Sequence, residues 1–358
     1  MAGTDSSNHN DTEQAAAAWE ARSTVARLAF GQMAAQTLGA ATRMGIFERI
    51  GAGERTADDL ARDLGTQPQA THRLLRALAG LQLLTETAPG TFATTPAGDL
   101  LRPDVPGTML ALARLFTRPL LQGGWDLLEE GIRTGRTTFD TAYGTDFFSY
   151  LKDRPELSAE FNAAMSQATR YVADVLPRHY DFGRFGTVVD VGGGDGTLLA
   201  GILRAHPGLR GILYDTAEGL AQAPERFARE GLTGRVTLET GDFFASAPPG
   251  GDLYLLKSVI HDWDDERCTT ILRHIRKVVP AGGTLLIAEP VLPPAVPAGE
   301  PDLTYLSDLN MLVTVGGRER TADDFAALCA AAGFRVSSLT PVPPQNVFHL
   351  IEAVPVPD

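Results

Sequence analysis

The chain has 358 residues, with 44 acidic and 31 basic side chains and a formal net charge of −13. This length suggests two domains or more, and so acidic a chain is a poor candidate for sequence-independent DNA binding, which needs clustered cations. Its two cysteines cannot form a disulfide framework, which favours a reducing compartment. We find no apolar run long enough to span a bilayer and no signal segment, and therefore expect a cytoplasmic protein with no membrane partner.

The first part of the chain has the pattern of a winged helix. Residues 1–18 are polar and predict a disordered tail, and residues 19–41 have apolar side chains at helical spacing. Two further helices are predicted over 56–65 and 68–79, and two short strands over 83–85 and 91–93 have turn residues between them. Helix, turn, helix and hairpin predict a winged-helix-like domain over residues 19–105.

The rest of the chain changes from helices to alternating strands and helices. The sequence pattern predicts a mainly helical connector over residues 106–180 and a second domain over residues 181–358. Five short apolar strands are predicted in it, over 187–191, 211–215, 236–240, 253–256 and 284–288, and helices over 197–205, 218–230 and 265–279. This alternation predicts an α/β, Rossmann-like domain with a parallel, doubly wound sheet that is covered on both faces.

One five-residue segment occurs twice in the sequence. Arg-Thr-Ala-Asp-Asp stands at residues 55–59 and again at 320–324. A threonine followed three residues later by an acidic residue is typical of a helix start, so we expect a helix to begin at each copy.

A glycine-rich loop follows the first strand of the second domain. Its sequence, Gly192-Gly-Gly194-Asp-Gly196, lets the backbone turn sharply and approach a ligand at the start of a helix. The dinucleotide fingerprint G-x-G-x-x-G/A is not met, because Thr197 stands at the third glycine position. Asp190, on the strand before the loop, suits a cationic amino-acid group better than a pyrophosphate.

Two more acidic residues end the next two strands. Asp215 stands where a carboxylate can accept both hydrogen bonds of a ribose diol. Asp242 can accept from an adenine amine while Phe243 lies against the ring. Because the carboxyl ends of parallel strands meet at one edge of a sheet, these acids predict a nucleoside-binding site there.

The motifs of the second domain, in this order, resemble those of one enzyme family. The glycine loop and Asp215 are followed by Gly-Asp-Phe-Phe at 241–244, Leu-Lys-Ser-Val-Ile-His-Asp-Trp at 256–263, Ala-Glu-Pro at 288–290 and Gly-Gly-Arg-Glu-Arg-Thr at 316–321. This is similar to the S-adenosylmethionine-dependent O-methyltransferases of the caffeate and isoflavone type, particularly those of bacterial natural-product and antibiotic pathways. The resemblance covers the chain from about residue 20 and implies a Rossmann-like class I methyltransferase domain.

The resemblance also implies roles for individual residues. It implies that His261 is the catalytic base, flanked by Glu289 and Glu319. The implied contacts of the cofactor, S-adenosylmethionine, are Gly192, Gly194, Asp215, Gly241, Asp242, Phe243, Lys257, Ser258, Trp263 and Ser166. Those of a small aromatic acceptor are Phe161, Asn162, Met165, Asn310, Met311 and Thr314, with residues 106–180 lining the acceptor pocket.

The residues themselves fit a base-assisted methyl transfer. A phenol, with a pKa near ~10, reacts faster if a base removes its proton, and a histidine with a pKa of ~6.5 suits this role. A carboxylate on the other ring nitrogen would fix the tautomer. His261, Asp262, Asp264 and Asp265 could instead hold a metal ion, but these acids fit the start of the helix over 265–279 better, so we expect no metal.

Two other functions fit parts of the sequence. The winged helix could read DNA in a ligand-sensing regulator, but residues 20–110 contain nine arginines and nine acids, which favours a dimerisation domain without nucleic acid. The resemblance likewise implies a homodimer. Some proteins of this fold bind the same cofactor yet hydroxylate or decarboxylate aromatic polyketides. The presence of His261 and both glutamates favours methyl transfer to a hydroxyl.

Overall fold

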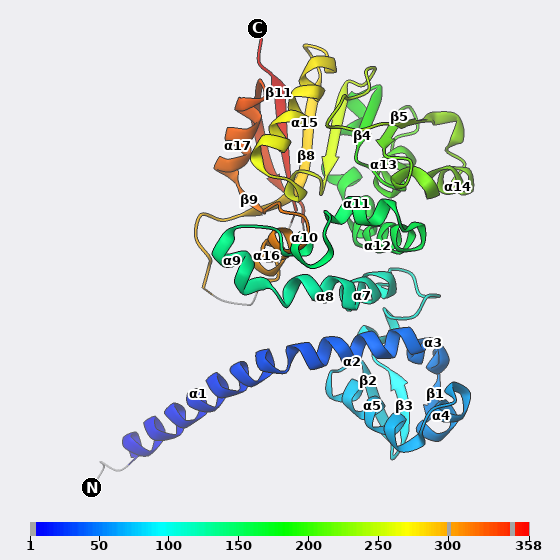
Figure 1. Ribbon diagram of the computed structural model, residues 1–358, viewed down its shortest axis with the longest axis vertical. Helices are drawn as coiled ribbons and strands as arrows, with labels where there is room; N and C mark the ends of the chain where they lie inside the picture. The colour runs from blue at the N-terminus through cyan, green and yellow to red at the C-terminus, as the bar shows by residue number, and fades with distance from the viewer. Residues whose placement is uncertain (1–4, 299–301, 344–347, 358) are drawn as a thin grey trace. The chain divides into compact units, whose positions relative to one another are not determined.

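The computed structural model describes residues 5–298, 302–343 and 348–357, with side chains from residue 14 onward. It divides into two compact units, Met1–Arg118 and Pro119–Asp358 (Figure 1). The boundary between the two units, after Arg118, falls within the predicted connector over 106–180. None of the helices in the described ranges is long and apolar enough to cross a membrane.

The first unit contains helices around a small antiparallel sheet. The predicted helices and hairpin are confirmed as α4 (Ala57–Leu64), α5 (Pro68–Gly80), β2 (Leu84–Ala88) and β3 (Thr91–Thr94). A short strand that the sequence did not predict, β1 (Glu54–Thr56), pairs with β3, so the strand order is β1-β3-β2. The core includes Ile46, Phe47, Leu60, Leu75 and Phe92. The remaining elements are α2 (Gly31–Met44), α3 (Ile46–Ile50), α6 (Pro96–Asp99) and α7 (Leu110–Phe116).

The N-terminal segment is helical, and the prediction of a disordered tail through residue 18 is wrong for residues 5–18. Helix α1 (Asp5–Ala29) begins at Asp5 and includes four consecutive alanines at 15–18, the residue with the highest helix propensity. Beyond them the helix carries Trp19 and Leu28, which are 72% and 77% exposed in the single chain. Helix α1 therefore leaves large apolar side chains uncovered.

The second unit is built on the predicted sheet. All five predicted strands are present as β4 (Thr187–Val191), β5 (Arg210–Asp215), β6 (Val236–Thr240), β7 (Leu253–Lys257) and β8 (Thr284–Leu292). They are parallel, in the order β6-β5-β4-β7-β8. Two antiparallel strands, β11 (Phe348–Pro355) and β10 (Phe334–Pro341), extend the sheet beyond β8. This pair was not predicted from the sequence, and neither was the short β9 (Arg320–Thr321), which pairs with β8.

Helices cover both faces of this sheet, as predicted (Figure 1). On one face, side chains of β4, β7 and β8 pack against α15 (Asp265–Val278) and α17 (Ala322–Ala331). On the other face they pack against α12 (Pro155–His179) and α13 (Thr197–Ala205). Val188 and Val189 face opposite ways, as the two-residue period of a strand requires. The further helices are α8 (Pro119–Trp125), α9 (Leu128–Thr134), α10 (Thr138–Tyr143), α11 (Phe147–Lys152), α14 (Ala223–Arg229) and α16 (Thr304–Thr314).

The strand order fixes where a ligand can bind. From β4 the chain continues to β5 and β6 on one side and then returns to β7 on the other side of β4. In open α/β sheets ligands bind outside the carboxyl ends of the strands at such a reversal. The glycine loop, Asp215 and His261 all follow carboxyl ends near this point.

The repeated pentapeptide starts a helix at both of its copies, as predicted. Thr56 caps α4 by accepting a hydrogen bond from the amide of Asp59. Thr321 caps α17 in the same way, and Asp324 completes a capping box. The arginines that precede the two threonines have different surroundings, because the side chain of Arg55 is 32% exposed and that of Arg320 is fully buried.

Candidate active site

The glycine loop between β4 and α13 has the backbone that its glycines allow. Gly192, Gly194 and Gly196 have φ angles of 72°, 58° and 77°, in the left-handed region that other residues rarely adopt. A side chain at Gly192 would lie 2.8 Å from Val259, so this turn and the segment after β7 are in close contact. The loop therefore brings backbone N–H groups to the edge of the sheet where the acidic residues lie.

Asp215 and Asp190 provide negative charge beside this loop. The carboxylate of Asp215 accepts from the amide of Gly194 at 2.8 Å and from that of Thr216 at 2.7 Å. Asp190 is buried, and its Oδ2 atom has no hydrogen-bond partner among the described residues. Burial and the nearby Asp215 raise the pKa of Asp190 to about 7, and burial also raises the pKa of Asp215. A positively charged ligand would stabilise the negative charges of both carboxylates.

Aromatic side chains cluster after the carboxyl end of β6. Asp242 accepts from the amide of Phe244 at 2.8 Å, which fixes the turn that carries Phe243. The rings of Phe243 and Phe244 have their centroids 6.1 Å and 4.8 Å from that of Trp263. The indole Nε1 of Trp263 is buried and has no partner among the described residues. Gly241 is required here, because a Cβ atom would lie 2.3 Å from the ring of Tyr214.

Lys257 and Ser258 stand at the end of β7. The ammonium of Lys257 donates to the hydroxyl of Thr169 on α12 at 3.1 Å. Burial lowers the pKa of Lys257, although the negative charges of Glu289 and Asp190 act to raise it. Ser258 has a φ of 53°, which is uncommon for a residue other than glycine. Such backbone strain is often retained at functional sites.

Three polar side chains of α12 reach three different strand ends. They are Asn162, Ser166 and Thr169, whose spacing of four and three residues places them on one face of the helix. Asn162 donates to the carbonyl of Glu218 at 3.0 Å, beyond β5. Ser166 shares a hydrogen bond of 2.7 Å with Thr197 of the glycine loop's helix, and Thr169 accepts from Lys257. The hydroxyl of Ser166 and the amide of Asn162, expected to contact ligands, thus already hold α12 against the sheet edge.

Sequence reasoning missed a further member of this network, Arg226 on α14. Its guanidinium donates to Ser166 Oγ at 2.9 Å, to the carbonyl of Asp195 at 3.1 Å and to the Asp195 carboxylate. Asp195 in turn accepts from the hydroxyl of Thr197 at 2.7 Å. Nothing in the local sequence pairs Arg226 with a residue 31 positions earlier, so only the fold could reveal this link.

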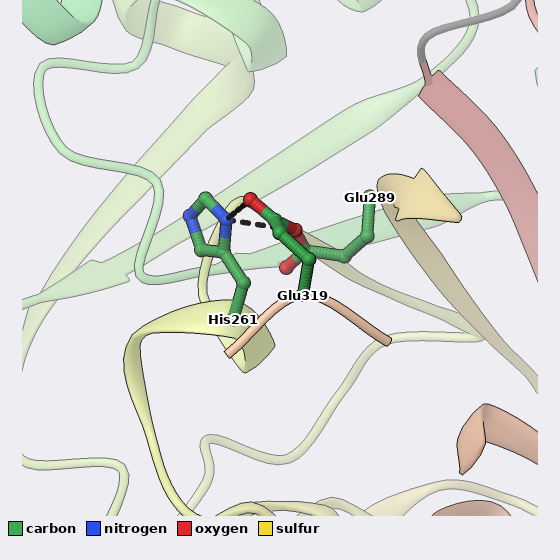
Figure 2. Close-up of side chains that lie close together, drawn as sticks. All are labelled: His261, Glu289 and Glu319. Carbon is green, nitrogen blue, oxygen red and sulfur yellow. Dashed lines mark hydrogen bonds and ion pairs between the residues drawn. The ribbon is translucent and has the colours of Figure 1, made fainter. Parts of the chain in front are cut away.

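His261 faces two buried glutamates, as Figure 2 shows. Its Nδ1 atom lies 3.1 Å from Oε1 of Glu319 and 3.7 Å from Oε2 of Glu289. Asp262 Oδ1 lies 3.6 Å from the other ring nitrogen, Nε2. Glu319 is oriented by the hydroxyl of Ser307, which donates to the same Oε1 atom at 3.0 Å. The structure therefore brings together the three residues that the sequence suggested for catalysis.

The charges around His261 make it a strong base. Burial alone would lower its pKa, but Glu289, Asp262 and Glu319 outweigh burial and raise the pKa of His261 to about 10. Burial likewise raises the pKa of Glu289, and it raises that of Asp262 to about 7. The imidazole and its carboxylates act as one coupled group, in which each negative charge favours a protonated ring.

The same atoms could also ligate a cation. One ligand atom each from His261, Glu289 and Glu319 lies within 4.8 Å of the others. This set differs from His261, Asp262, Asp264 and Asp265, the set weighed from the sequence. Asp264 instead caps α15 by accepting from the amide of Arg267, and Asp265 pairs with Arg318 and Arg320. Oε1 of Glu289 is likewise engaged, because it accepts from two backbone amides of the loop that carries His261.

The residues suggested for the acceptor lie on α12 and α16. Phe161 belongs to an aromatic cluster, with its ring centroid 5.4 Å from that of Phe147, and Met165 on the same helix is partly buried. On α16, Met311 and Thr314 are buried. Asn310 accepts from the indole of Trp125 at 3.3 Å and from Thr314 at 3.2 Å, so its carbonyl is already engaged.

Comparisons with known proteins define the class to which this fold and site belong. Residues 125–335 match the O-methyltransferase domain, and residues 26–104 match the O-methyltransferase dimerisation domain. Together the two matches cover most of the chain. The chain belongs to the O-methyltransferase family.

Individual relatives are similar along nearly their whole length. The chain is 45% identical to O-demethylpuromycin-O-methyltransferase of Streptomyces alboniger, over 97% of this chain and 93% of that protein. The structure of the mitomycin 7-O-methyltransferase MmcR aligns with a TM-score of 0.87 and 34% identity, over 96% of this chain and 100% of that one. The O-methyltransferase NcsB1, in complex with S-adenosylmethionine and a hydroxynaphthoic acid, aligns with a TM-score of 0.75 and 32% identity, over 90% and 96%.

Proposed function

We propose that this protein transfers the methyl group of S-adenosylmethionine to a phenolic hydroxyl of a small aromatic metabolite, with His261 as general base. The observation that carries the proposal is the hydrogen bond from His261 Nδ1 to the buried Glu319, beside the strand ends that carry Asp215 and Asp242. This bond leaves Nε2 to take the proton of the acceptor. Relatives named for methylation of aromatic natural products support the same reaction.

The residues at the strand ends fit the cofactor. The unpartnered carboxylate oxygen of Asp190 and the charge of Asp215 suit the cationic methionine part and the ribose hydroxyls. Phe243 and Trp263 offer apolar surface to the adenine, and Asp242 offers an acceptor to its amine. The ammonium of Lys257 suits the cofactor's carboxylate end or its adenine edge. We assign the nearby glycines Gly192, Gly194 and Gly241, together with Ser166 and Ser258, to the wall of this site.

The chain contributes a base of suitable strength. When bound, the cofactor supplies a methyl group that is already activated, so the protein has to position the acceptor and remove its proton. Glu289, Asp262 and Glu319 raise the pKa of His261 towards that of a phenol, ~10, and so favour transfer of the phenol's proton to Nε2. Glu319 and Glu289 then stabilise the imidazolium that forms.

We assign an aromatic acceptor to the space near α12 and α16. Phe161, Met165 and Met311 supply apolar contacts, and Thr314 and the two asparagines, Asn162 and Asn310, shape the polar edge. The exposed apolar side chains of α1, among them Trp19 and Leu28, support a homodimer formed through the first unit. No nucleic acid or membrane is required for this activity, and a cytoplasmic location fits it.

The proposal is tested by mass spectrometry. The purified protein is incubated with S-adenosylmethionine and a panel of phenols that begins with O-demethylpuromycin, and the expected product is heavier by one methyl group. His261→Ala should lose turnover yet still bind S-adenosylhomocysteine in calorimetry. Activity should persist after treatment with EDTA, since no step requires a metal. Full turnover by His261→Ala would refute the base assignment, and a loss of activity with EDTA would favour a cation held by His261, Glu289 and Glu319.

A further inference from the structure

Arg320, the residue after Glu319, is a buried arginine whose side chain is 0% exposed. Its guanidinium donates to the carbonyl of Ile260 at 2.8 Å and to the carbonyl of Trp263 at 2.8 Å. These two carbonyls flank His261 and Asp262 in the chain. The same guanidinium donates to Oδ1 of Asp265 at 2.7 Å, in the first turn of α15. Arg320 therefore spans the loop that carries the proposed base.

The other side of this loop is held by Glu289. Its Oε1 atom accepts from the amides of Val259 at 2.8 Å and Ile260 at 2.9 Å. The backbone at Gly317 approaches the loop so closely that a Cβ atom would lie 1.9 Å from the carbonyl oxygen of His261. The carboxylate of Glu289 thus holds the N–H groups of the loop. The segment that contains Glu319 and Arg320 holds its carbonyl groups.

We propose that Arg320 is a positioning residue, which holds the 260–263 backbone so that the ring of His261 stays within hydrogen-bond reach of Glu319. This role rests on the proposed function of His261 as base. Because Arg320 and Glu319 are consecutive, any shift of the loop relative to Arg320 also changes the distance between His261 and Glu319. Since the guanidinium is planar, with donors in fixed directions, it can bridge both carbonyls, whereas a lysine ammonium cannot span them.

The chain provides a matched control for this residue. Arg55 begins the other copy of the Arg-Thr-Ala-Asp-Asp segment and likewise precedes a capping threonine. Its side chain is 32% exposed and pairs with Asp63 and the carbonyl of Arg49. Arg55 and Arg320 thus share local sequence and helix start, and differ in that Arg320 alone contacts the loop of His261. A substitution at Arg55 reports what the arginine contributes to the helix start itself.

The experiment compares Arg320→Lys with Arg55→Lys in the methyl-transfer assay. We expect Arg320→Lys to lower kcat at least tenfold while the KM for the cofactor and the affinity for S-adenosylhomocysteine change less than threefold. The pH profile supplies the decisive measurement. A loosened loop moves His261 away from its carboxylates, so its pKa falls and the rise of kcat/KM with pH shifts to lower pH. Arg55→Lys should leave kcat and the pH profile as in the wild type.

Three outcomes separate the proposals. If Arg320→Lys lowers the melting temperature and kcat but keeps the wild-type pH profile, Arg320 is only structural and our inference is wrong. If Arg320→Lys has wild-type kcat while His261→Ala is inactive, the role of Arg320 is wrong and the base assignment stands. If His261→Ala is fully active, the base assignment and the inference both fail. Arg320→Lys is used rather than Arg320→Ala because it keeps the buried positive charge beside Asp265.

Discussion

The ring of His261 donates from Nδ1 to the carboxylate of Glu319, and the two atoms are 3.1 Å apart. This contact determines the tautomer, because the nitrogen that carries the hydrogen is the one facing the acid. In the neutral ring the lone pair is then on Nε2, toward which an acceptor hydroxyl can point. Glu319 is nearly fully buried, so its charge acts on the ring with little screening by water.

Replacing this acid by its amide should reduce catalysis without emptying the cofactor site. Glu319→Gln keeps the shape and can still accept from Nδ1, but it loses the charge that stabilises the imidazolium. A hydrogen bond to a charged group contributes about 1.5–3 kcal/mol, so we expect kcat to fall roughly tenfold to hundredfold. Calorimetric binding of S-adenosylhomocysteine should be unchanged. Glu225→Gln, on an exposed turn of α14, is the matched control and should have wild-type kcat. Equal losses in both variants would contradict the role of Glu319.

The reaction should accelerate as pH rises. The base must be unprotonated to accept the phenol's proton, and the pKa of His261 is raised to about 10, so kcat/KM for the acceptor should increase through neutral pH and beyond. Glu289→Gln removes one of the negative charges that raise this pKa, and the rise should shift to lower pH. The measurement is a pH series of initial rates with both proteins. A profile that is flat from pH 6 to 9 would be incompatible with His261 as base.

Cofactor affinity should depend on the charge of Asp215. Asp215→Asn retains one acceptor oxygen for the amide of Gly194 but loses the charged hydrogen bonds to a ribose diol, so S-adenosylhomocysteine should bind roughly tenfold or more weakly. Isothermal titration calorimetry measures the change. Glu225→Gln again serves as a nearby acidic control. Unchanged affinity in Asp215→Asn would remove Asp215 from the cofactor site.

The polar face of α12 should also contribute to ligand retention. Ser166→Ala removes the link between this helix, Thr197 and Arg226, and Thr169→Val removes the hydroxyl that accepts from Lys257. With about 0.5–1.5 kcal/mol for each neutral hydrogen bond, we expect S-adenosylhomocysteine to bind roughly twofold to tenfold more weakly in each variant. Tyr171→Phe, at a position on the same helix that is 52% exposed, is the control. If all three variants bind alike, the contacts of α12 do not support the ligand site.

Stability without cofactor should decrease as pH rises through the titration of Asp190. Its pKa is raised from 3.8 to about 7 in the folded protein, so the folded state binds the proton more tightly than the unfolded state. The resulting stabilisation is fully present below pH ~4 and is lost as pH rises through about 7. Asp190→Asn does not titrate, so its melting temperature should fall less between pH 5 and 8 than that of the wild type. Parallel melting curves across this range would refute the raised pKa.

Much of the fold was predictable because its signals are local. The strand at 236–240 and the helix at 197–205 have the bounds that the sequence predicted, since an apolar run and a glycine-to-helix transition mark them. The antiparallel pair β10 and β11 was missed, because apolar and polar residues alternate irregularly along both strands. The prediction of a disordered tail was wrong for residues 5–18, because it gave the polar residues more weight than the helix propensity of the alanine run.

The residues of the site could be predicted from the sequence, but the hydrogen bonds that hold them in place could not. The motifs predicted that His261, Glu289 and Glu319 would act together, and the structure places them in contact. It could not be foreseen that one oxygen of Glu289 would hold the amides before His261, or that Arg226 and Arg320 would hold the glycine loop and the base loop. Such hydrogen bonds join residues that are 29 to 60 positions apart, and their geometry exists only once the chain has folded.

The lysine content of the chain makes Lys257 a built-in chemical reporter. The other lysines, Lys152 and Lys277, are exposed, whereas Lys257 lies at the end of β7 with a lowered pKa. An amine with a lowered pKa has a larger free-base fraction at neutral pH, so an acylating reagent small enough to enter should modify Lys257 readily while the site is empty. A bound cofactor would shield it and leave the two exposed lysines as an internal standard. Peptide mass spectrometry could then measure occupancy in the unaltered protein, without a fluorescent label or a radioactive methyl group.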